Sequence, residues 1–426
     1  MECQYVLIGN SAATLAAIDS IRKFDRVGKI VLLNREHGTA YSRVALPYFV
    51  AGEMALDELL IRQRPDYERA GVELMEDATV TSIDASAKQI VLADGRRVRY
   101  GKALIATGSE CSVPPIHSLD TVPHHYLWTL DDAKRMKAAA EKAQTAVVIG
   151  GGFIGMLAAE ALRKLNIRLT IVEMAPQLLP QLLDSEGGKR FGQAVKDEGV
   201  TVRIGSLVEA VAPTADKIEV SLKGGESIAA DMIAVAAGVR PNIGALTGGP
   251  CALNTGVVVD EFLQTDCTDI YAAGDVAEVN DFLSDAKTIH AIWPTAVDQG
   301  RVAGSNMAGK RLAYPGSLGM NVVELFNVTL AELGRFREGP TDDVKLLGGS
   351  EGLYRKLVVD KDGTLVGAMY LGDENGVAEM GVIHGMIKRR AQWREFADYQ
   401  LPRFTYATTI HGRNRVVPRA AHGSPR

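Results

Sequence analysis

The stretch Ala146–Glu173 reads AVVIGGGFIGMLAAEALRKLNIRLTIVE and decides the fold. An apolar, β-branched run at 147–149 leads into a glycine-rich turn, an Ala- and Leu-rich segment follows, and a second apolar run ends on an acid. The turn has the spacing G-x-G-x-x-G at Gly150, Gly152 and Gly155. In a strand–turn–helix–strand unit, such glycines give a tight turn, close approach of backbone N–H groups to a pyrophosphate, and close helix–strand packing. The stretch therefore predicts a dinucleotide-binding fold.

The helix and the terminal acid of this unit predict how the dinucleotide is held. Its phosphates are expected at the helix N-terminus, around Phe153 and Ile154, where unpaired N–H groups and the helix dipole favour an anion. Glu173 ends the second apolar run, where it can accept both ribose hydroxyls of an adenosine and would repel a 2′-phosphate. This favours NADH over NADPH.

The N-terminal segment repeats the same theme in a looser form. A strand at 5–8 leads into the turn GNSAAT at 9–14, and a helix at 13–23 and a strand at 30–33 follow. Gly9 occupies the first glycine position of the G-x-G-x-x-G motif, whereas Ser11, followed by Ala12, occupies the second. The sequence predicts a second dinucleotide here, and FAD is the usual companion of a nicotinamide. Its ribose partner stays open between two residues, Asn34 and Glu36.

Three apolar runs end in small residues, at 103–108, 233–238 and 270–275. These runs predict strands of the sheets that end beside bound ligands. The third ends on Asp275, which can hold a polyol hydroxyl or, alternatively, serve as a turn or helix-capping acid. A helix beginning after Pro294 would offer positive potential to the N1–C2=O edge of a reduced, anionic flavin.

Composition excludes several classes of function. The 426 residues carry a formal net charge of −5, which gives no sign of a nucleic-acid or membrane surface and suits two or three domains. No apolar run is long enough to span a membrane, and the N-terminus lacks the pattern of a signal peptide.

The four scattered cysteines show no metal-binding spacing, so we expect no metal site and a cytoplasmic protein with reduced thiols. The Arg-rich tail 391–426, with His411 and His422, is predicted to be a solvated or partner-facing arm.

Taken together, these motifs resemble the pyridine nucleotide-disulfide oxidoreductase superfamily over nearly the whole chain. Their order is that of the superfamily, and the segments YSR at 41–43, WPTAVDQGRVAG from Trp293 and YRKLVV from Tyr354 are similar to NADH:rubredoxin reductases and the flavin portion of NADH-dependent nitrite reductases. The resemblance implies an α/β fold with two Rossmann-like, glutathione-reductase-like domains and a C-terminal α+β interface domain. The implied boundaries are 1–112 with 246–314 for FAD, 113–245 for NAD, and 315–426 for the interface domain, through which a homodimer is possible.

The resemblance also implies which residues contact each cofactor. For FAD these are Arg43, Ala106, Thr107, Gly108, Asp275, Trp293, Thr295, Ala296 and, in a strand beside the adenine, Val80. On the NAD side, Gly238 ends the second of the three apolar runs and joins the residues of the glycine turn.

Two departures from the family pattern bear on the chemistry. Val44, before Ala-Leu-Pro-Tyr, occupies the place where the coenzyme A-disulfide reductase branch carries a redox cysteine. The C-x-x-x-x-C pair of the glutathione reductase type is missing as well, so a disulfide substrate is not expected. Leu157 stands where relatives usually carry a Glu, and with Phe153 it would form an apolar wall on the nicotinamide side.

The sequence thus predicts an enzyme in which NADH gives hydride to flavin N5 and the flavin passes electrons to a small rubredoxin- or ferredoxin-like protein. Hydride transfer needs alignment of the two rings rather than a protein acid or base. Two alternatives remain at this point. The same fold could reduce oxygen, a quinone or an organic substrate directly, or the chain could be a flavin-bound assembly or regulatory subunit with little NADH turnover.

Overall fold

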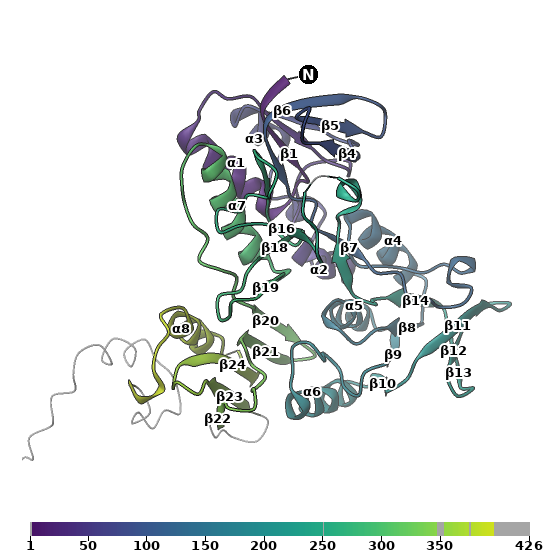
Figure 1. The fold of residues 1–426 in the computed structure, drawn as a ribbon. Helices are drawn as coiled ribbons and strands as arrows, with labels where there is room; N and C mark the ends of the chain where they lie inside the picture. Colours follow the sequence, from purple (N-terminus) through teal and green to yellow (C-terminus); the bar gives the residue numbers. More distant parts are fainter. Residues whose placement is uncertain (1, 250, 347–352, 375, 396–426) are drawn as a thin grey trace, which may run out of the picture. The chain divides into compact units, whose positions relative to one another are not determined.

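A computed structural model describes residues 2–249, 251–346, 353–374 and 376–395 (Figure 1). By the density of their contacts, the residues divide into two compact units, one made of 1–181 and 195–318 and the other of 182–194 and the chain from 319 onward. This division does not separate an FAD half from an NAD half, so the three predicted domain boundaries stay predictions. The tail from 396, with His411 and His422, lies outside the described residues.

The first unit contains a sheet in the order β3-β2-β1-β6-β5-β4, with β17 paired to β6. Its central strands are parallel: β1 (Glu2–Ile8), β2 (Ile30–Leu33), β3 (Val72–Met75), β6 (Arg97–Ile105) and β17 (Ile270–Ala272). Ile8 is in register with both Leu33 and Ile105, so these strands end at the same edge. Ligands of open α/β sheets bind at that edge. The predicted turns at 9, 34, 106 and 273 therefore meet there.

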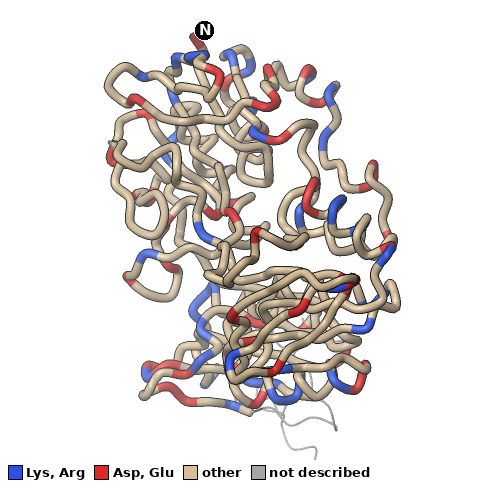
Figure 2. Tube along the Cα trace, turned by 90° about the vertical axis from the view of Figure 1, so that its right-hand side faces the viewer, with Lys and Arg blue, Asp and Glu red and all other residues tan. Residues whose placement is uncertain are grey.

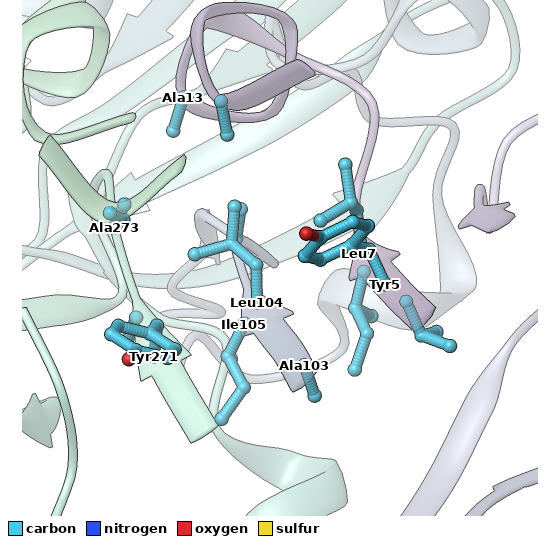
Figure 3. Packing of buried hydrophobic residues seen from close by; sticks show 14 of the residues in the cluster. Tyr5, Leu7, Ala13, Ala103, Leu104, Ile105, Tyr271 and Ala273 are labelled. Atoms are coloured by element: carbon cyan, nitrogen blue, oxygen red, sulfur yellow. The ribbon is translucent and has the colours of Figure 1, made fainter. Parts of the chain in front are cut away.

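Close helix packing covers this sheet. Helix α1 (Ala12–Phe24) lies against α7 (Trp293–Met307), as Figure 1 shows. A side chain at Gly300 would overlap the carbonyl oxygen of Ala13, so glycine is required for this approach. Below α1, Leu7, Leu104 and Tyr271 of three neighbouring strands belong to one buried, mainly apolar core with Ala13 (Figure 3). Burial on both faces explains why the strands read as continuous apolar runs.

A second parallel sheet, in the order β10-β9-β8-β14, confirms the strand–turn–helix–strand prediction. Its elements are β8 (Thr145–Ile149), α5 (Phe153–Lys164), β9 (Arg168–Glu173), β10 (Thr201–Ile204) and β14 (Met232–Val235). Ile149 is in register with Val172 and Val235, so the glycine turn, Glu173 and the 236–238 segment share one edge.

The second unit is an antiparallel sheet in the order β20-β21-β24-β23-β22 with a late helix packed on it. Its elements are β20 (Met320–Leu325), β21 (Val328–Gly334), β22 (Asp343–Leu346), β23 (Tyr354–Val359), β24 (Leu365–Gly372) and α8 (Gly376–Lys388). The parallel sheets of the first unit confirm the predicted α/β fold class.

The remaining elements are mostly short. They are η1 (Arg43–Ala45), α2 (Leu46–Val50), η2 (Asp57–Leu59), α3 (Arg64–Arg69), β4 (Val80–Asp84), β5 (Gln89–Leu92), β7 (Ser109–Cys111), η3 (Leu119–Thr121), α4 (Leu130–Ala140), α6 (Ser185–Asp197), β11 (Val208–Pro213), β12 (Ile218–Leu222), β13 (Ser227–Ala230), β15 (Val239–Pro241), η4 (Gly244–Leu246), β16 (Val257–Val258), β18 (Ala277–Asn280), β19 (Lys287–Thr288) and η5 (Trp393–Glu395).

Among the described residues, no helix has both the length and the apolar character needed to cross a bilayer. Basic and acidic residues are interspersed along the tube in Figure 2. This mixture agrees with the small net charge of the chain, −5.

Candidate functional site

The first glycine turn has the geometry of a phosphate cradle. Gly9 has φ +100°, and a side chain there would overlap the carbonyl oxygen of Ala106, so only glycine fits. Ser11 is the N-cap residue of α1, but its side chain accepts no hydrogen bond from the helix backbone. The first N–H groups of the helix, starting at Ala12, therefore remain available to an anion. The degenerate turn therefore keeps the features that a pyrophosphate needs.

Two buried polar atoms at this turn have no protein partner, the amide nitrogen Nδ2 of Asn10 and the hydroxyl of Thr14. The buried Tyr67 orients Asn10 by donating to its Oδ1 at 2.9 Å, and the Tyr67 oxygen accepts the Ala40 N–H at 3.0 Å. Unpaired buried donors are costly in a folded protein, so their presence at the turn fits a polar ligand there. Sequence reasoning missed Asn10, although a polar amide between Gly9 and Ser11 was a usable signal.

The two candidates for the ribose of FAD behave differently. Asn34 is buried, and its side-chain amide bonds to the loop that follows it. It donates to the Gly38 carbonyl at 3.1 Å and accepts the Glu36 N–H at 3.3 Å. The Glu36 carboxylate is bound by the Tyr41 hydroxyl at 2.6 Å and forms an ion pair with Arg43. Glu36 and Arg43, predicted as separate FAD contacts, are thus partners of each other.

A chain of hydrogen bonds connects Arg43 to Asp275. Arg43 donates to the Trp128 carbonyl at 2.9 Å, the Trp128 indole N–H donates to the Ser109 carbonyl at 2.9 Å, and the Ser109 hydroxyl donates to Asp275 at 2.8 Å. Burial raises the pKa of Asp275, and the Ser109 hydrogen bond and the Arg43 charge oppose this rise. Sequence reasoning missed Ser109 and Trp128, since neither carries a recognisable motif.

The other FAD-side candidates surround the same edge. The Thr107 hydroxyl donates to the Asn242 carbonyl at 2.7 Å, and Gly108 has φ +66° with open space where a side chain would be. Val80 lies half-buried on β4. Helix α7 begins two residues earlier than predicted, and its first turn holds Trp293, Thr295 and Ala296 without a side-chain cap. The Gly274 N–H donates to Gln299 of α7 at 2.7 Å, which fixes this turn beside the exit of β17.

The second glycine turn repeats the cradle with stricter packing. Gly150 has φ +106°, and a side chain on it would overlap the Ala236 carbonyl, whereas one on Gly155 would overlap the Gly150 carbonyl. Gly152, the N-cap of α5, has nothing within 4 Å of the place where a side chain would be. The first and third glycines therefore serve the fold, and the second leaves room for a ligand.

Glu173 is buried beside this turn, and its carboxylate accepts the Gly151 N–H at 2.6 Å and the Ala175 N–H at 2.7 Å. Each carboxylate oxygen can accept more than one hydrogen bond, so the ribose role predicted for Glu173 fits this arrangement. Gly238, with φ +92°, has open space around it at the same sheet edge. Phe153 and Ile154 form the half-buried first turn of α5.

Helices α2 and α5 bring the two nucleotide-binding regions into contact. The Lys164 ammonium of α5 lies 5.7 Å from the centroid of the Tyr48 ring of α2 and pairs with Glu53 at 2.8 Å. Val44, next to α2, is 59% exposed, so an apolar side chain faces open space at the place where a thiol would act. Leu157 is half-buried one helical turn after Phe153. The apolar wall on the nicotinamide side stays a prediction.

Comparison with known proteins agrees with this geometry. Residues 3–300 match the family model described as pyridine nucleotide-disulphide oxidoreductase. The chain belongs to this family. The chain is accordingly an oxidoreductase that uses FAD and NADH. The orphaned polar atoms at Asn10 and Thr14, the Gly9 cradle and the open space at Gly152 fit the two nucleotides.

Three relatives illustrate the range of this family. The chain is 35% identical to the NADH-dependent phenylglyoxylate dehydrogenase subunit epsilon of Aromatoleum evansii, over 91% of this chain and 92% of that protein. It is 33% identical to the ferredoxin–NAD(+) reductase component of the p-cumate 2,3-dioxygenase system of Pseudomonas putida, over 64% of this chain and 67% of that protein. The solved NAD-dependent persulfide reductase from A. fulgidus superimposes with a TM-score of 0.88 at 26% identity, over 95% of this chain and 80% of that one.

Proposed function

We propose that this family member is an FAD-dependent NADH:acceptor oxidoreductase that passes electrons to a protein-borne redox centre without a thiol relay. The observation that carries the proposal is Val44. It stands exposed beside α2, where α2 packs against the NAD helix α5. Because valine cannot form a thiolate or a mixed disulfide, electrons cannot leave the flavin through a protein thiol at this place.

The residues of the chain then have positioning roles. Gly150 and Gly152 admit the NADH pyrophosphate to the start of α5, and Glu173 holds the adenosine ribose. Phe153 and Leu157 exclude water on the nicotinamide side. On the other side, the Gly9 turn and Asp275 hold FAD, which when bound accepts the hydride and can release electrons one at a time.

The nature of the relatives supports a protein acceptor. One is a subunit of a larger NADH-dependent enzyme, and another serves as a ferredoxin–NAD(+) reductase component. Both names describe chains that work with other proteins. A small iron–sulfur or rubredoxin-like carrier is therefore the acceptor we propose, and the cytoplasmic location and homodimer remain predictions.

An anaerobic titration with NADH tests the proposal. We expect the flavin absorption of the FAD-loaded protein to bleach within seconds, and a stoichiometric ferredoxin or rubredoxin to reoxidise the flavin. Failure of NADH to bleach a fully FAD-loaded protein would contradict the first step. Rapid oxygen consumption that no added carrier protein changes would instead show direct reduction of a small molecule.

A second candidate is favoured by the match over nine tenths of the chain to an enzyme subunit. In this reading, the chain is the NADH-linked flavin subunit of a larger oxidoreductase whose other subunits carry the substrate site. Isolation from the native host decides between the two. Co-purification of defined partners, with NADH reducing the isolated chain but no free carrier being reduced, would favour the subunit. Little bleaching by NADH in the isolated chain, with partners bound, would point to the assembly role.

A further inference from the structure

We propose that Cys251, Asp266 and Cys267 form a binding site for a zinc-class divalent metal ion. Their ligand atoms, two Sγ and one carboxylate oxygen, all lie within 4.8 Å of one another, and no other such cluster occurs in the described residues. In a tetrahedral zinc site with Zn–S bonds of about 2.3 Å, neighbouring ligand atoms are about 3.5–4 Å apart. The cluster is thus close to the size that a bound ion requires.

Hydrogen bonds made by the Thr265 and Asp266 side chains join the segments that carry the three ligands. The Thr265 hydroxyl accepts the Cys267 N–H at 3.1 Å and lies 3.9 Å from the Cys251 sulfur. One Asp266 oxygen accepts the Ala252 N–H at 2.9 Å, which ties the segment 251–252 to the segment 265–267. The carboxylate keeps lone pairs for a metal while it holds this backbone contact.

A second observation at the cluster comes from Tyr100 of β6. Its side chain is only 3% exposed, and its hydroxyl has no hydrogen-bond partner. Tyr100 belongs to the same buried core as Cys251, and Cys267 packs against that core. An unpaired buried hydroxyl costs free energy. A metal-bound thiolate or water would give this hydroxyl an acceptor.

The donor set indicates the class of metal. Thiolates are soft ligands and suit zinc-class ions, whereas Mg²⁺ and Ca²⁺ take oxygen ligands. Cys251 is buried and Cys267 is half-buried, while Asp266 is exposed, which gives the ion an entry path. Water would occupy the fourth coordination position of the ion, on the exposed side of the site where Asp266 lies.

The expected consequence of binding is local order beside the FAD site. The Thr265 N–H donates to the Ile270 carbonyl at 2.9 Å, so the ligand segment continues directly into β17, whose exit carries Asp275. An ion bridging Cys251 and Cys267 would close the segment between them and stabilise the folded state by mass action.

The test uses the full-length, FAD-loaded chain, reduced, freed of metal by dialysis and then titrated with Zn²⁺ or Co²⁺. We expect one ion per chain, measured by elemental analysis, and thiolate-to-cobalt charge-transfer bands with Co²⁺. Cys251→Ser and Cys267→Ser should each weaken Zn²⁺ binding at least tenfold. Cys3→Ser and Cys111→Ser are the controls, matched for a buried and a half-buried thiol, and should bind like the wild type.

Asp266→Asn keeps both thiols and covers the case in which a cysteine variant fails to fold. It should weaken binding while the FAD content stays unchanged. Zn²⁺ binding that none of the three ligand substitutions alters would overturn the proposal, and so would the absence of thiolate-to-cobalt bands. Loss of two titratable thiols in the unreduced, metal-free protein would also overturn it, because it would assign the pair to a disulfide.

Discussion

The Ser109 hydroxyl donates a hydrogen bond of 2.8 Å to Oδ2 of Asp275, and this bond joins the strand that leaves the FAD sheet after Gly108 to the exit of β17. The bond favours the ionised carboxylate, whose pKa burial otherwise raises. In the proposed FAD site, Ser109 would therefore keep Asp275 able to accept a hydroxyl of FAD, although it has no catalytic chemistry of its own.

Ser109→Ala should weaken FAD binding because Asp275 loses the donor that stabilises its charge. We expect a dissociation constant about tenfold higher, which corresponds to about 1.4 kcal/mol. The loss should grow as the pH falls, since a carboxyl with a higher pKa becomes neutral sooner. Flavin fluorescence during titration of the apoprotein measures this. Ser206→Ala is the control, because that hydroxyl donates to the Ile204 carbonyl at the surface. Equal affinity of the Ser109→Ala and wild-type proteins between pH 6 and 8 would refute the role.

Tyr67→Phe tests whether the first glycine turn is held in place from outside the motif. The variant removes the hydroxyl that orients Asn10 and accepts the Ala40 N–H. Leaving buried groups unpaired costs about 1–3 kcal/mol, so we expect both lower thermal stability of the apoprotein and weaker FAD binding. Tyr48→Phe keeps the ring on an exposed site and serves as the control. A variant that loses stability but binds FAD normally would show that Tyr67 only supports the fold.

The buried carboxyl group of Glu332 on β21 should make the stability of the second unit depend on pH. Burial raises its pKa from 4.5 to about 7, and the hydrogen bond from Asn321 at 2.6 Å opposes the rise. A raised folded-state pKa means that the folded state binds the proton more tightly than the unfolded state. The associated stability is therefore present below the unfolded pKa and lost as the pH rises through about 7, by a few kcal/mol.

Glu332→Gln should remove this dependence, because the amide stays neutral and its oxygen still accepts from Asn321. We expect the denaturant midpoint of the variant to exceed that of the wild type at pH 8 and to approach it at pH 5. Glu324→Gln, on an exposed site of β20, is the control. Parallel pH profiles for the wild type and Glu332→Gln would show that the carboxyl does not titrate in this range.

Local sequence patterns predicted the strands and turns because their causes lie within a few residues. The apolar runs before Gly9 and Gly150 are buried strands, and both glycines adopt positive φ against a neighbouring carbonyl. Helix α7 begins two residues before the predicted start, because Pro294 lies within the first helical turn, where its missing N–H costs nothing.

The contacts that orient the site could not be predicted from local pattern. Tyr67 reaches Asn10 across 57 residues, and Trp128 reaches Ser109 across 19. Cys251 and Cys267 meet only because the turn around Thr265 returns the chain to the same place. These pairings depend on how the strands are assembled, so no spacing rule reveals them.

Two glycines of the NAD turn have different expected roles: Gly155 is needed for packing, whereas Gly152 leaves room for the nucleotide. Substitutions at the two positions should therefore have different effects. Gly155→Ala would place a methyl group against the Gly150 carbonyl oxygen, so we expect a protein with a clearly lower melting temperature or no soluble product. Gly152→Ala has nothing within 4 Å of the new methyl group and a φ of −75°, which alanine adopts freely. Its melting temperature and FAD content should match the wild type, while the KM for NADH should rise at least tenfold because the methyl group meets the pyrophosphate. Unchanged NADH kinetics in a folded Gly152→Ala protein would place the nicotinamide dinucleotide somewhere other than this turn.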